Sequence, residues 1–375
     1  MNGNLRVGTL FGIPFYVNFS WFLVLALVTL EFGRDLAIIS SLGGALPWIL
    51  GLIAALLLFA SVLAHELGHS LVAIRQGIEV KSITLFIFGG LAMLGKESET
   101  PGQAFSVAIA GPAVSLVLFA LLTLIGVSLP LPNALESIIA LLAQINLILA
   151  LFNLIPGLPL DGGNVLKAAV WKITGNPNKG VLFASRVGQF FGWLAVATGA
   201  LAVLNISPYG SFWTLFIGLF LLQNAGFSAQ TALVRDKLDG FTAEDAVIPN
   251  SPVVSEDLTL REFVNNYVIG QTQWRKFLVA NEGGQLVGEI SPDDLKAIAT
   301  SLWTETCVGE LAKPIEDTTT VRADCSLLDV VKLIEAQPLQ QLPVVREDGV
   351  VLGLLEKSSI RRLLEKESQA KLSQI

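Results

Sequence analysis

The stretch Ser61-Val-Leu-Ala-His-Glu-Leu-Gly-His-Ser70 contains two histidines four positions apart, with a glutamate directly after the first. On a helix, positions i and i+4 lie on one face, one turn apart. His65 and His69 can therefore bind one metal ion, and Glu66 can reach a water molecule on that ion. The alternative is a pair of core histidines that hydrogen-bond to a neighbouring helix. Two histidines and a glutamate on one turn leave too many polar groups for that arrangement, so the stretch predicts a metal site.

The surroundings of this stretch strengthen the metal-site interpretation. His65 and His69 are the only histidines among the 375 residues, and they lie in an apolar run from about residue 46 to residue 74. That run is long enough to cross a bilayer. An ionisable side chain inside such a run is costly unless it is paired or liganded, so we expect these side chains to be functional.

The composition is that of a membrane protein with an acidic, more polar C-terminal third. Hydrophobic residues make up 53% of the chain, charged residues make up 15%, and the mean hydropathy is +0.65. Residues 1–240 contain 11 Lys+Arg and 10 Asp+Glu, whereas residues 241–375 contain 13 and 21. That acidic balance argues against nucleic-acid binding. The only two cysteines, Cys307 and Cys325, suggest ordinary thiols in a reducing compartment rather than a disulfide framework.

Six apolar runs are long enough to span a membrane. They are Phe15–Glu31, Pro47–Ile74, Ala104–Leu129, Ser137–Ile155, Val181–Leu204 and Phe212–Ala232. A seventh piece, Ile83–Leu94, is too short to span, and its β-branched residues and glycine break favour a re-entrant strand or hairpin with an edge that can pair with an extended peptide. A plain interfacial loop is the alternative. We therefore predict an α-helical integral membrane domain of about six transmembrane helices plus a re-entrant strand or hairpin, followed by a soluble α/β domain.

Positive charge predicts the orientation of these spans. Six spans place both chain ends on one side, and cytoplasmic loops are enriched in lysine and arginine. The other side holds only Arg34. The side of the termini holds Arg6, Arg75, Lys81, Lys96, Lys167, Lys172, Lys179, Arg186, Arg235 and Lys237. We expect a multi-pass protein of the cell's inner or plasma membrane with cytoplasmic N- and C-termini. His65 then lies roughly ten residues, about 15 Å, from the cytoplasmic end of its helix.

A tetrahedral catalytic metal needs a third protein ligand and leaves its fourth position for water. No histidine remains, so we expect an acid, and Asp161 in Phe152-Asn-Leu-Ile-Pro-Gly-Leu-Pro-Leu-Asp-Gly-Gly163 is the best-placed candidate. The two prolines break the fourth helix, and Gly162 and Gly163 allow close backbone approach. Asn153 lies eight residues earlier and can hydrogen-bond a developing oxyanion or a substrate carbonyl. The alternative role for Asp161 is that of a helix cap or turn acid.

Together these motifs resemble the site-2 protease family of intramembrane zinc metalloproteases. The resemblance rests on H-E-L-G-H at residues 65–69, A-G-P at 110–112 and N-x-x-P-x-x-P-L-D-G-G at 153–163, and it covers roughly residues 10–235. It implies one zinc ion per chain, held by the two histidines and the aspartate, with the glutamate as general base and the asparagine assisting catalysis. It also implies transmembrane protein substrates, such as anti-sigma factors or signal-peptide remnants. Too few residues follow His69 before the third span for a PDZ domain, so the chain resembles the PDZ-lacking branch with a C-terminal regulatory module.

After Arg235 the pattern changes to short apolar runs separated by charged turns, and a unit of roughly 60 residues occurs twice. Each copy is expected to fold as helix, strand, tight turn, strand, helix. The pair resembles a tandem CBS (cystathionine-β-synthase-type) module, a module that commonly binds adenine nucleotides such as ATP or AMP. We also expect a homodimer formed through this module. The predicted divisions are an intramembrane metalloprotease domain at 1–236, a linker at 237–241, CBS repeats at 242–304 and 305–366, and a polar tail at 367–375.

The CBS resemblance also implies a nucleotide site. In that family a G-x-I-[ST]-x-x-D segment places a hydroxyl and a carboxylate on ribose. The matching residues are Gly288, Ile290, Ser291 and Asp294. The second repeat departs from the pattern, because Glu356 and Ser359 stand where the hydroxyl and the acid are expected. If a nucleotide binds, we expect one competent site, which uses Ser291 and Asp294. A purely structural dimerisation module, in which these two residues cap a helix, is the alternative.

The function we predict is that of an intramembrane zinc endopeptidase for membrane-tethered substrates, modulated by adenine nucleotide. A CBS-regulated transporter or channel is the alternative, since such modules also gate transport. Transport needs polar residues along a path across the bilayer, often with repeated halves, whereas the polar residues here converge on one spot. An inert substrate-holding relative would have lost a ligand or the base, and neither is lost here.

Overall fold

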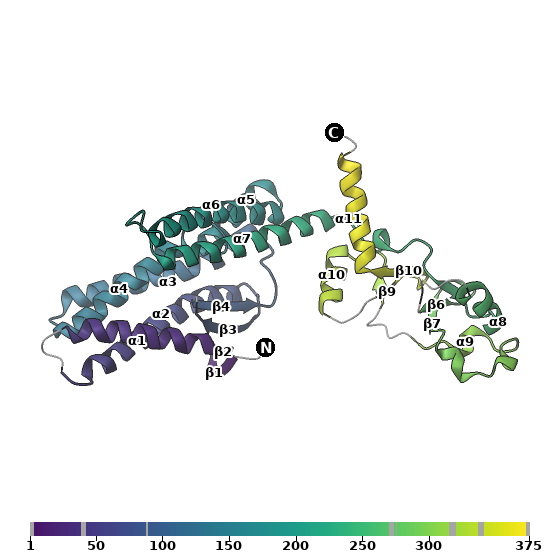
Figure 1. Ribbon diagram of the computed structural model, residues 1–375, viewed down its shortest axis with the longest axis horizontal. Coiled ribbons are helices and arrows are strands. Elements are labelled where there is room, and N and C mark those ends of the chain that lie inside the picture. The colour runs from purple at the N-terminus through teal and green to yellow at the C-terminus, as the bar shows by residue number, and fades with distance from the viewer. Residues whose placement is uncertain are drawn as a thin grey trace. The chain divides into compact units, whose positions relative to one another are not determined.

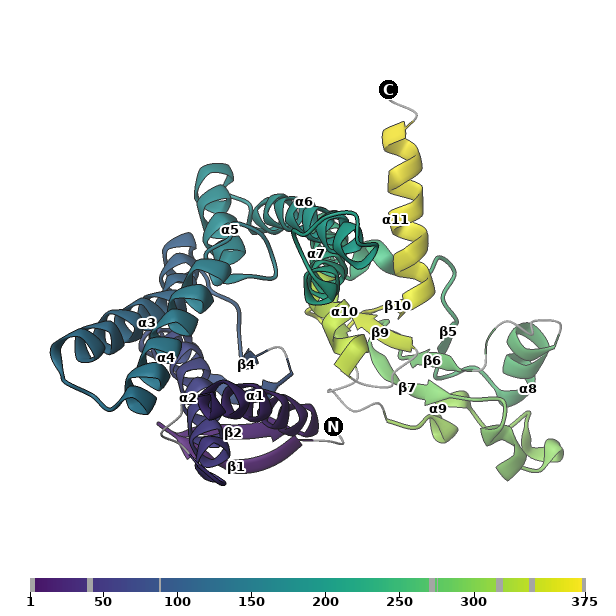
Figure 2. The same ribbon diagram turned by 60° about the vertical axis from the view of Figure 1, so that its left-hand side comes forward.

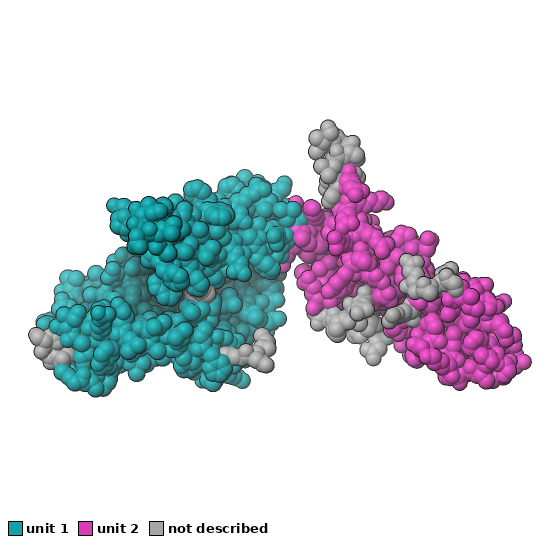
Figure 3. Space-filling view, viewed as in Figure 1, with its two compact units in different colours: residues 1–233 teal, residues 234–375 magenta. Residues whose placement is uncertain are grey.

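The computed structural model describes residues 4–38, 43–87, 89–269, 274, 276–314, 320–336 and 341–372, and the chain separates into two compact units. The first unit is Met1–Leu233 and the second is Val234–Ile375 (Figure 1, Figure 3). The long apolar helices begin in the first unit, and both repeats lie in the second.

Long apolar helices make up most of the first unit. In chain order the described helices are α1 (Phe19–Ala37), α2 (Leu46–Arg75), α3 (Pro101–Ser128), α4 (Asn133–Asn153), α5 (Asp161–Thr174), α6 (Pro177–Val203) and α7 (Phe212–Leu238). Five of them, α2, α3, α4, α6 and α7, are long and apolar enough to cross a membrane. They correspond to five of the six predicted spans. α5 is a shorter helix that the apolar runs do not predict.

The first predicted span, Phe15–Glu31, is a strand followed by a helix. Residues Ile13–Asn18 form strand β2, and the Asn18 side chain then caps α1 by accepting a backbone hydrogen bond at 3.0 Å. α1 packs along the N-terminal half of α2, where the Trp21 and Phe59 rings lie 4.9 Å apart. Residues 15–18 are therefore extended rather than helical, because strand pairing on both sides satisfies their backbone.

Strand β2 belongs to a four-stranded sheet that covers the C-terminal half of α2. The strands, in their order across the sheet, are β1 (Asn4–Leu10), β2, β3 (Val80–Phe86) and β4 (Gly89–Leu94). β2 and β3 run parallel, and the other neighbouring pairs are antiparallel; Figure 2 shows β1 and β2 beside α1. Ile13, Ile78 and Ile83 bury their side chains against Ala73 of α2. The hairpin predicted within Ile83–Leu94 is present as β3 and β4, with residue 88 outside the described residues, whereas β1 and β2 were not predicted.

Small residues let the helices of the first unit approach closely. A β-carbon added at Gly68 of α2 would lie 2.9 Å from the Ala110 carbonyl oxygen of α3. One added at Gly199 of α6 would lie 2.3 Å from the Leu215 backbone nitrogen of α7. Such crossings are typical of membrane helices, because lipid offers no hydrophobic driving force and close van der Waals contact holds the helices together. The first crossing brings α3 directly against the histidine-bearing part of α2.

The second unit contains two copies of one arrangement, with sheets ordered β5-β6-β7 and β10-β9-β8. After the turn η1 (Glu244–Ala246), the first copy contains β5 (Val253–Ser255), α8 (Leu260–Phe263), η2 (Val264–Val268), β6 (Phe277–Ala280), β7 (Leu286–Ile290), η3 (Asp294–Ala297) and η4 (Thr300–Leu302). The second contains α9 (Val308–Leu311), β8 (Val321–Arg322), α10 (Leu327–Ala336), β9 (Gln341–Val345), β10 (Val351–Glu356) and α11 (Lys357–Leu372). The predicted closing helix is present in the second copy as α11. The first copy has only the short turns η3 and η4 in its place.

The tight turns of the two copies pair with each other. The Leu286 amide donates to the Gly349 carbonyl at 3.1 Å, and the Val351 amide donates to the Gly284 carbonyl at 2.9 Å. Gly284 and Gly349 have φ values of +74° and +84°, a conformation that glycine adopts without strain. The two copies are therefore related by matching turns as well as by sequence.

Candidate functional site

His65, His69 and Asp161 bring three ligand atoms together. Both histidines lie on one face of α2, and Asp161 is the first residue of α5. His65 Nε2 lies 3.1 Å from Asp161 Oδ2 and 3.3 Å from His69 Nε2, and His69 Nε2 lies 3.2 Å from the same carboxylate oxygen. Two imidazole nitrogens and one carboxylate oxygen that face a common point are the donor set of a catalytic zinc site with an open fourth position. These residues therefore fit zinc.

Glycines allow Asp161 to reach the histidines. The loop between α4 and α5 is packed so tightly that a β-carbon at Gly162 would lie 2.3 Å from the Leu154 carbonyl oxygen. The same loop lies on α6, where a β-carbon at Gly188 would lie 2.0 Å from the Leu158 carbonyl oxygen. The close backbone approach predicted after Asp161 is therefore present. The carboxylate also lies in the first turn of a helix, where the positive end of the helix dipole stabilises a negative charge.

Helix α3 covers the histidines on another side. A β-carbon at Gly111 would lie 2.1 Å from His69 Nε2 and 2.7 Å from His65 Nε2, so no side chain fits there. The outer ring nitrogens also meet α3, because His69 Nδ1 lies 2.6 Å from the Val107 carbonyl oxygen and His65 Nδ1 lies 2.9 Å from Ser115 Oγ. Sequence reasoning gave no role to these three α3 residues. The A-G-P motif, a glycine beside a proline within an apolar helix, was the signal that could have found the glycine.

The side chain of Glu66, a residue of α2, lies against strand β4. A β-carbon at Gly90 would lie 2.3 Å from Glu66 Cγ and 3.0 Å from its Oε1, so the strand backbone is in direct contact with this side chain. Ala92 lies two residues further along β4, on the same face of the strand as Gly90. β4 is the last strand in the order of its sheet. The carboxylate is therefore held beside a sheet edge and next to the first metal-ligand candidate.

Helix α4 contains two asparagines, Asn146 and Asn153. Asn153 is the half-buried last residue of α4, so it begins the loop that leads to Asp161. The catalytic role of Asn153 stays a prediction. Asn146, two turns earlier, is fully buried, and its Nδ2 donates to Ser61 Oγ of α2 at 3.0 Å. This polar link between α4 and α2, one turn before His65, was not predicted from the sequence.

In the second unit, the predicted ribose-binding residues Ser291 and Asp294 meet in one turn. The Ser291 amide donates to Asp294 Oδ2 at 2.8 Å, and Asp294 Oδ1 is ion-paired with Lys313. The hydrogen bond from Lys313 lowers the pKa of the Asp294 carboxyl below its usual range. Ser291 Oγ also accepts a hydrogen bond from the Asp293 amide at 3.2 Å, so both side chains make contacts within the turn. Nucleotide binding there stays a prediction.

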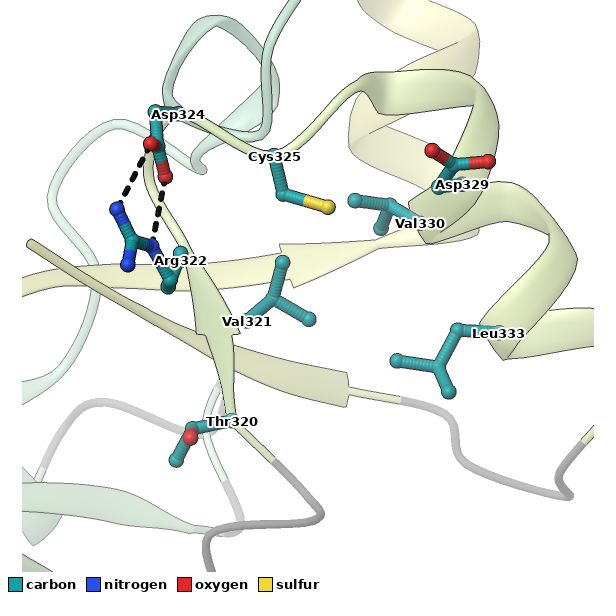
Figure 4. Close-up of a pocket in the computed structure, with 8 residues that line it drawn as sticks. All are labelled: Thr320, Val321, Arg322, Asp324, Cys325, Asp329, Val330 and Leu333. Atoms are coloured by element: carbon teal, nitrogen blue, oxygen red, sulfur yellow. Dashed lines mark hydrogen bonds and ion pairs between the residues drawn. The ribbon is translucent and has the colours of Figure 1, made fainter.

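The second repeat has the same turn with different chemistry. The Glu356 amide donates to Ser359 Oγ at 3.1 Å, so a hydroxyl replaces the carboxylate of the first repeat. A surface hollow of about 330 Å³ also lies in this repeat, lined by residues of β8 and α10 (Figure 4). Arg322 at its rim is paired with Asp324 at 2.9 Å, and Cys325 is one of its lining residues. Its arginine is thus already neutralised by a neighbouring acid.

Comparison with known proteins agrees with this geometry. The model of "Peptidase family M50" matches residues 53–134 and 131–195, and the model of the CBS domain matches residues 308–366. A Synechocystis protein provisionally named a zinc metalloprotease is 63% identical over 365 residues, which cover 97% of this chain and 96% of the relative. Rip3 of Mycobacterium tuberculosis, with the same provisional name, is 31% identical over 357 residues, which cover 94% of this chain and 91% of the relative.

The fold also resembles a solved structure, the site-2 protease from Methanocaldococcus jannaschii, with a TM-score of 0.44 and 27% identity over 60% of this chain and 95% of that chain. The relatives cover almost the whole chain, and their names describe the chemistry that the donor set fits. The five apolar helices make it a multi-pass membrane protein. The chain belongs to peptidase family M50, the site-2 protease family of zinc metalloproteases, and carries a CBS domain in its C-terminal unit.

Proposed function

We propose that this protein is an intramembrane zinc endopeptidase that hydrolyses a peptide bond within transmembrane segments of membrane-tethered proteins. One observation carries the proposal: His65, His69 and Asp161 meet beside Glu66, and the histidines lie on a helix long and apolar enough to cross a bilayer. Zinc, when bound by these residues, supplies Lewis acidity that polarises a carbonyl and makes water more acidic.

The protein's own side chains supply proton transfer and orientation. Glu66 follows the ligand His65 directly, so its carboxylate takes a proton from the attacking water and returns it to the leaving amine. Asn153 donates from its amide group to the scissile carbonyl oxygen, where negative charge develops. A helical substrate holds that carbonyl in an i→i−4 hydrogen bond, so the substrate unwinds locally before it is attacked.

Strand β4 is suited to hold the unwound substrate. It ends the strand order of its sheet, and its Gly90 lies against Glu66. A peptide that adds to a sheet edge is held by main-chain hydrogen bonds, which do not depend on its side chains. Substrate backbone paired with β4 is thus presented beside the general base. Anti-sigma factors and signal-peptide remnants are the substrate classes we propose.

The topology we propose has both termini in the cytoplasm of a cell with this protein in its inner or plasma membrane. The five long helices and the β2–α1 segment give six crossings, an even number. β2 spans about 20 Å as a strand and α1 about 28 Å as a helix, so together they match the length of α2, about 45 Å. The excess of lysine and arginine on the side of the termini supports this orientation.

The C-terminal unit is proposed to regulate the peptidase. The match to a CBS domain at residues 308–366 supports an adenine-nucleotide site in this module, and Ser291 and Asp294 are its proposed ribose contacts. The module is also proposed to form a homodimer. Titration of the full-length protein with AMP and ATP tests the site, and Asp294→Ala is expected to weaken binding. Equal binding by the wild type and Asp294→Ala places any nucleotide site elsewhere.

Cleavage in a defined membrane tests the proposed activity. The purified protein is reconstituted in liposomes with a single-span model substrate, and peptide products are measured by mass spectrometry. Glu66→Gln is expected to keep about one zinc per chain and to lose cleavage. Glu79→Gln changes an exposed glutamate after α2 and is expected to retain both. Cleavage by Glu66→Gln would show that Glu66 is not the general base. A wild-type protein that contains no zinc would show that the proposed metal site is wrong.

A further inference from the structure

Ser115 of α3 lies directly behind one of the metal-ligand candidates. It is fully buried, and its Oγ lies 2.9 Å from His65 Nδ1. The other nitrogen of the same ring, Nε2, faces Asp161 and His69. The two ring nitrogens of His65 therefore contact different helices, with the ligand-binding nitrogen on one side and a hydroxyl on the other.

The tautomer of the second histidine can be assigned from its partner. His69 Nδ1 faces the Val107 carbonyl oxygen at 2.6 Å, and a carbonyl oxygen can only accept a hydrogen bond. His69 Nδ1 therefore carries the proton, which leaves the Nε2 lone pair free for a metal. For His65 the partner is a hydroxyl, which can donate or accept. Metal binding through Nε2 requires the Nδ1–H tautomer, in which the Ser115 oxygen accepts.

We propose that Ser115 is a positioning residue for the metal centre. By accepting the hydrogen bond from His65 Nδ1–H, it holds the imidazole in the tautomer and the ring orientation that direct Nε2 toward Asp161 and His69. This inference rests on the metal site proposed above. It adds to that site a residue that lies outside the two motifs that contain the metal-ligand candidates. Ser115 touches neither the reacting bond nor the metal.

The spacing along α3 supports this role. Val107, Gly111 and Ser115 follow one another at intervals of four residues, so they lie along one face of the helix. On that face, the Val107 carbonyl oxygen contacts His69 and the Ser115 hydroxyl contacts His65. Between them, Gly111 has no side chain, which leaves room for the Nε2 atoms of both histidines. One helix thus contacts the outer nitrogens of both imidazoles.

Zinc affinity provides the first test, by chelator competition on the full-length protein carrying a tag without histidine. Ser115→Ala leaves a buried N–H without an acceptor and is expected to weaken zinc binding about 10- to 100-fold. Ser115→Thr keeps the hydroxyl and is expected to restore most of the affinity. Ser185→Ala is the matched control, because Ser185 of α6 is equally buried and its Oγ has no hydrogen-bond partner among the described residues.

Nitrogen NMR provides a readout that a purely structural serine would not change. His65 and His69 are the only histidines in the chain, so the ¹⁵N-histidine-labelled, zinc-loaded protein contains just two imidazoles. Ser115→Ala is expected to shift the His65 Nδ1 resonance and to leave that of His69 in place, whereas Ser185→Ala changes neither. Wild-type zinc affinity and an unchanged His65 resonance in Ser115→Ala overturn the positioning role alone. A wild type that binds no zinc overturns the metal site and this inference together.

Discussion

Gly90 of β4 lies against Glu66 of α2 so closely that a β-carbon at residue 90 would be 2.3 Å from Glu66 Cγ. Non-bonded carbon atoms do not approach to that distance, so a larger residue at position 90 must displace the glutamate or the strand. β4 is hydrogen-bonded to β3, and Glu66 lies on the helix that carries both histidines. The position of the proposed base and the position of the sheet edge are therefore linked sterically.

Gly90→Ala is expected to lower substrate cleavage while zinc binding persists. The new methyl group moves the Glu66 carboxylate, and a displacement of about 1 Å in a catalytic group can cost about 100-fold in rate. Cleavage rate and zinc content are measured on the same preparation. Gly8→Ala, in β1 of the same sheet, is the control, because a β-carbon there meets nothing within 4 Å. A Gly90→Ala protein as active as Gly8→Ala would show that the strand does not set the position of Glu66.

Gly111→Ala is expected to abolish zinc binding. The added β-carbon would lie 2.1 Å from His69 Nε2 and 2.7 Å from His65 Nε2, so it occupies the space where the ligand atoms meet. Gly126→Ala changes another glycine of α3, where the nearest atom is 3.5 Å away, and should bind zinc normally. Metal analysis of both purified variants gives the answer. Normal zinc content in Gly111→Ala would mean that the two rings point elsewhere in the membrane.

Asp161→Ala is expected to reduce the zinc content well below that of the wild type. The variant removes the single anionic ligand candidate, and two neutral imidazoles on one helix turn hold the ion less tightly. Asp161→Asn keeps the size of the side chain but removes its charge, so it separates the charge from the packing. Asp35→Asn, at an exposed position of α1, serves as the control. If zinc content is unchanged in both Asp161 variants, the third ligand must be reassigned.

Lys313→Ala is expected to raise the pKa of Asp294 toward its ordinary value. The Lys313 hydrogen bond lowers the pKa of the carboxyl in the folded state, so the pair stabilises the fold at neutral pH and that contribution is lost as the pH falls through the folded-state value. The lysine is exposed, so the effect on the free energy of unfolding is small. Carboxyl ¹³C NMR titration, assigned with Asp294→Asn, measures the pKa. An equal Asp294 pKa with and without Lys313 would show that the ion pair does not form in solution.

Local spacing explains what could be predicted at the site. His65 and His69 share a face because of the helix repeat, and Glu66 is next to His65 in the chain. Ser291 and Asp294 meet because a turn brings residues three apart together. Asp161 was found because acids are rare in apolar surroundings. Each of these inferences uses only the sequence close to the residue concerned.

Contacts between distant segments explain what could not be predicted. Gly90, Gly111 and Ser115 matter because of the helix or strand that each one faces, and nothing within a few residues of them specifies that neighbour. Strand β2 was assigned to a helix for the same reason. Its partner β3 is far along the chain, and an apolar run of that length is also compatible with a helix.

The parallel pairing of β2 with β3 has a consequence for how the protein is made. Phe15, Tyr16 and Val17 pair with Ile83, Thr84 and Leu85, and both α1 and α2 lie between these segments in the chain. The ribosome therefore completes two apolar helices before the partner of β2 exists. Before β3 is made, β2 can pair only with β1, which precedes it in the chain. The sheet that covers the histidine-bearing helix is thus completed only after that helix has been synthesised.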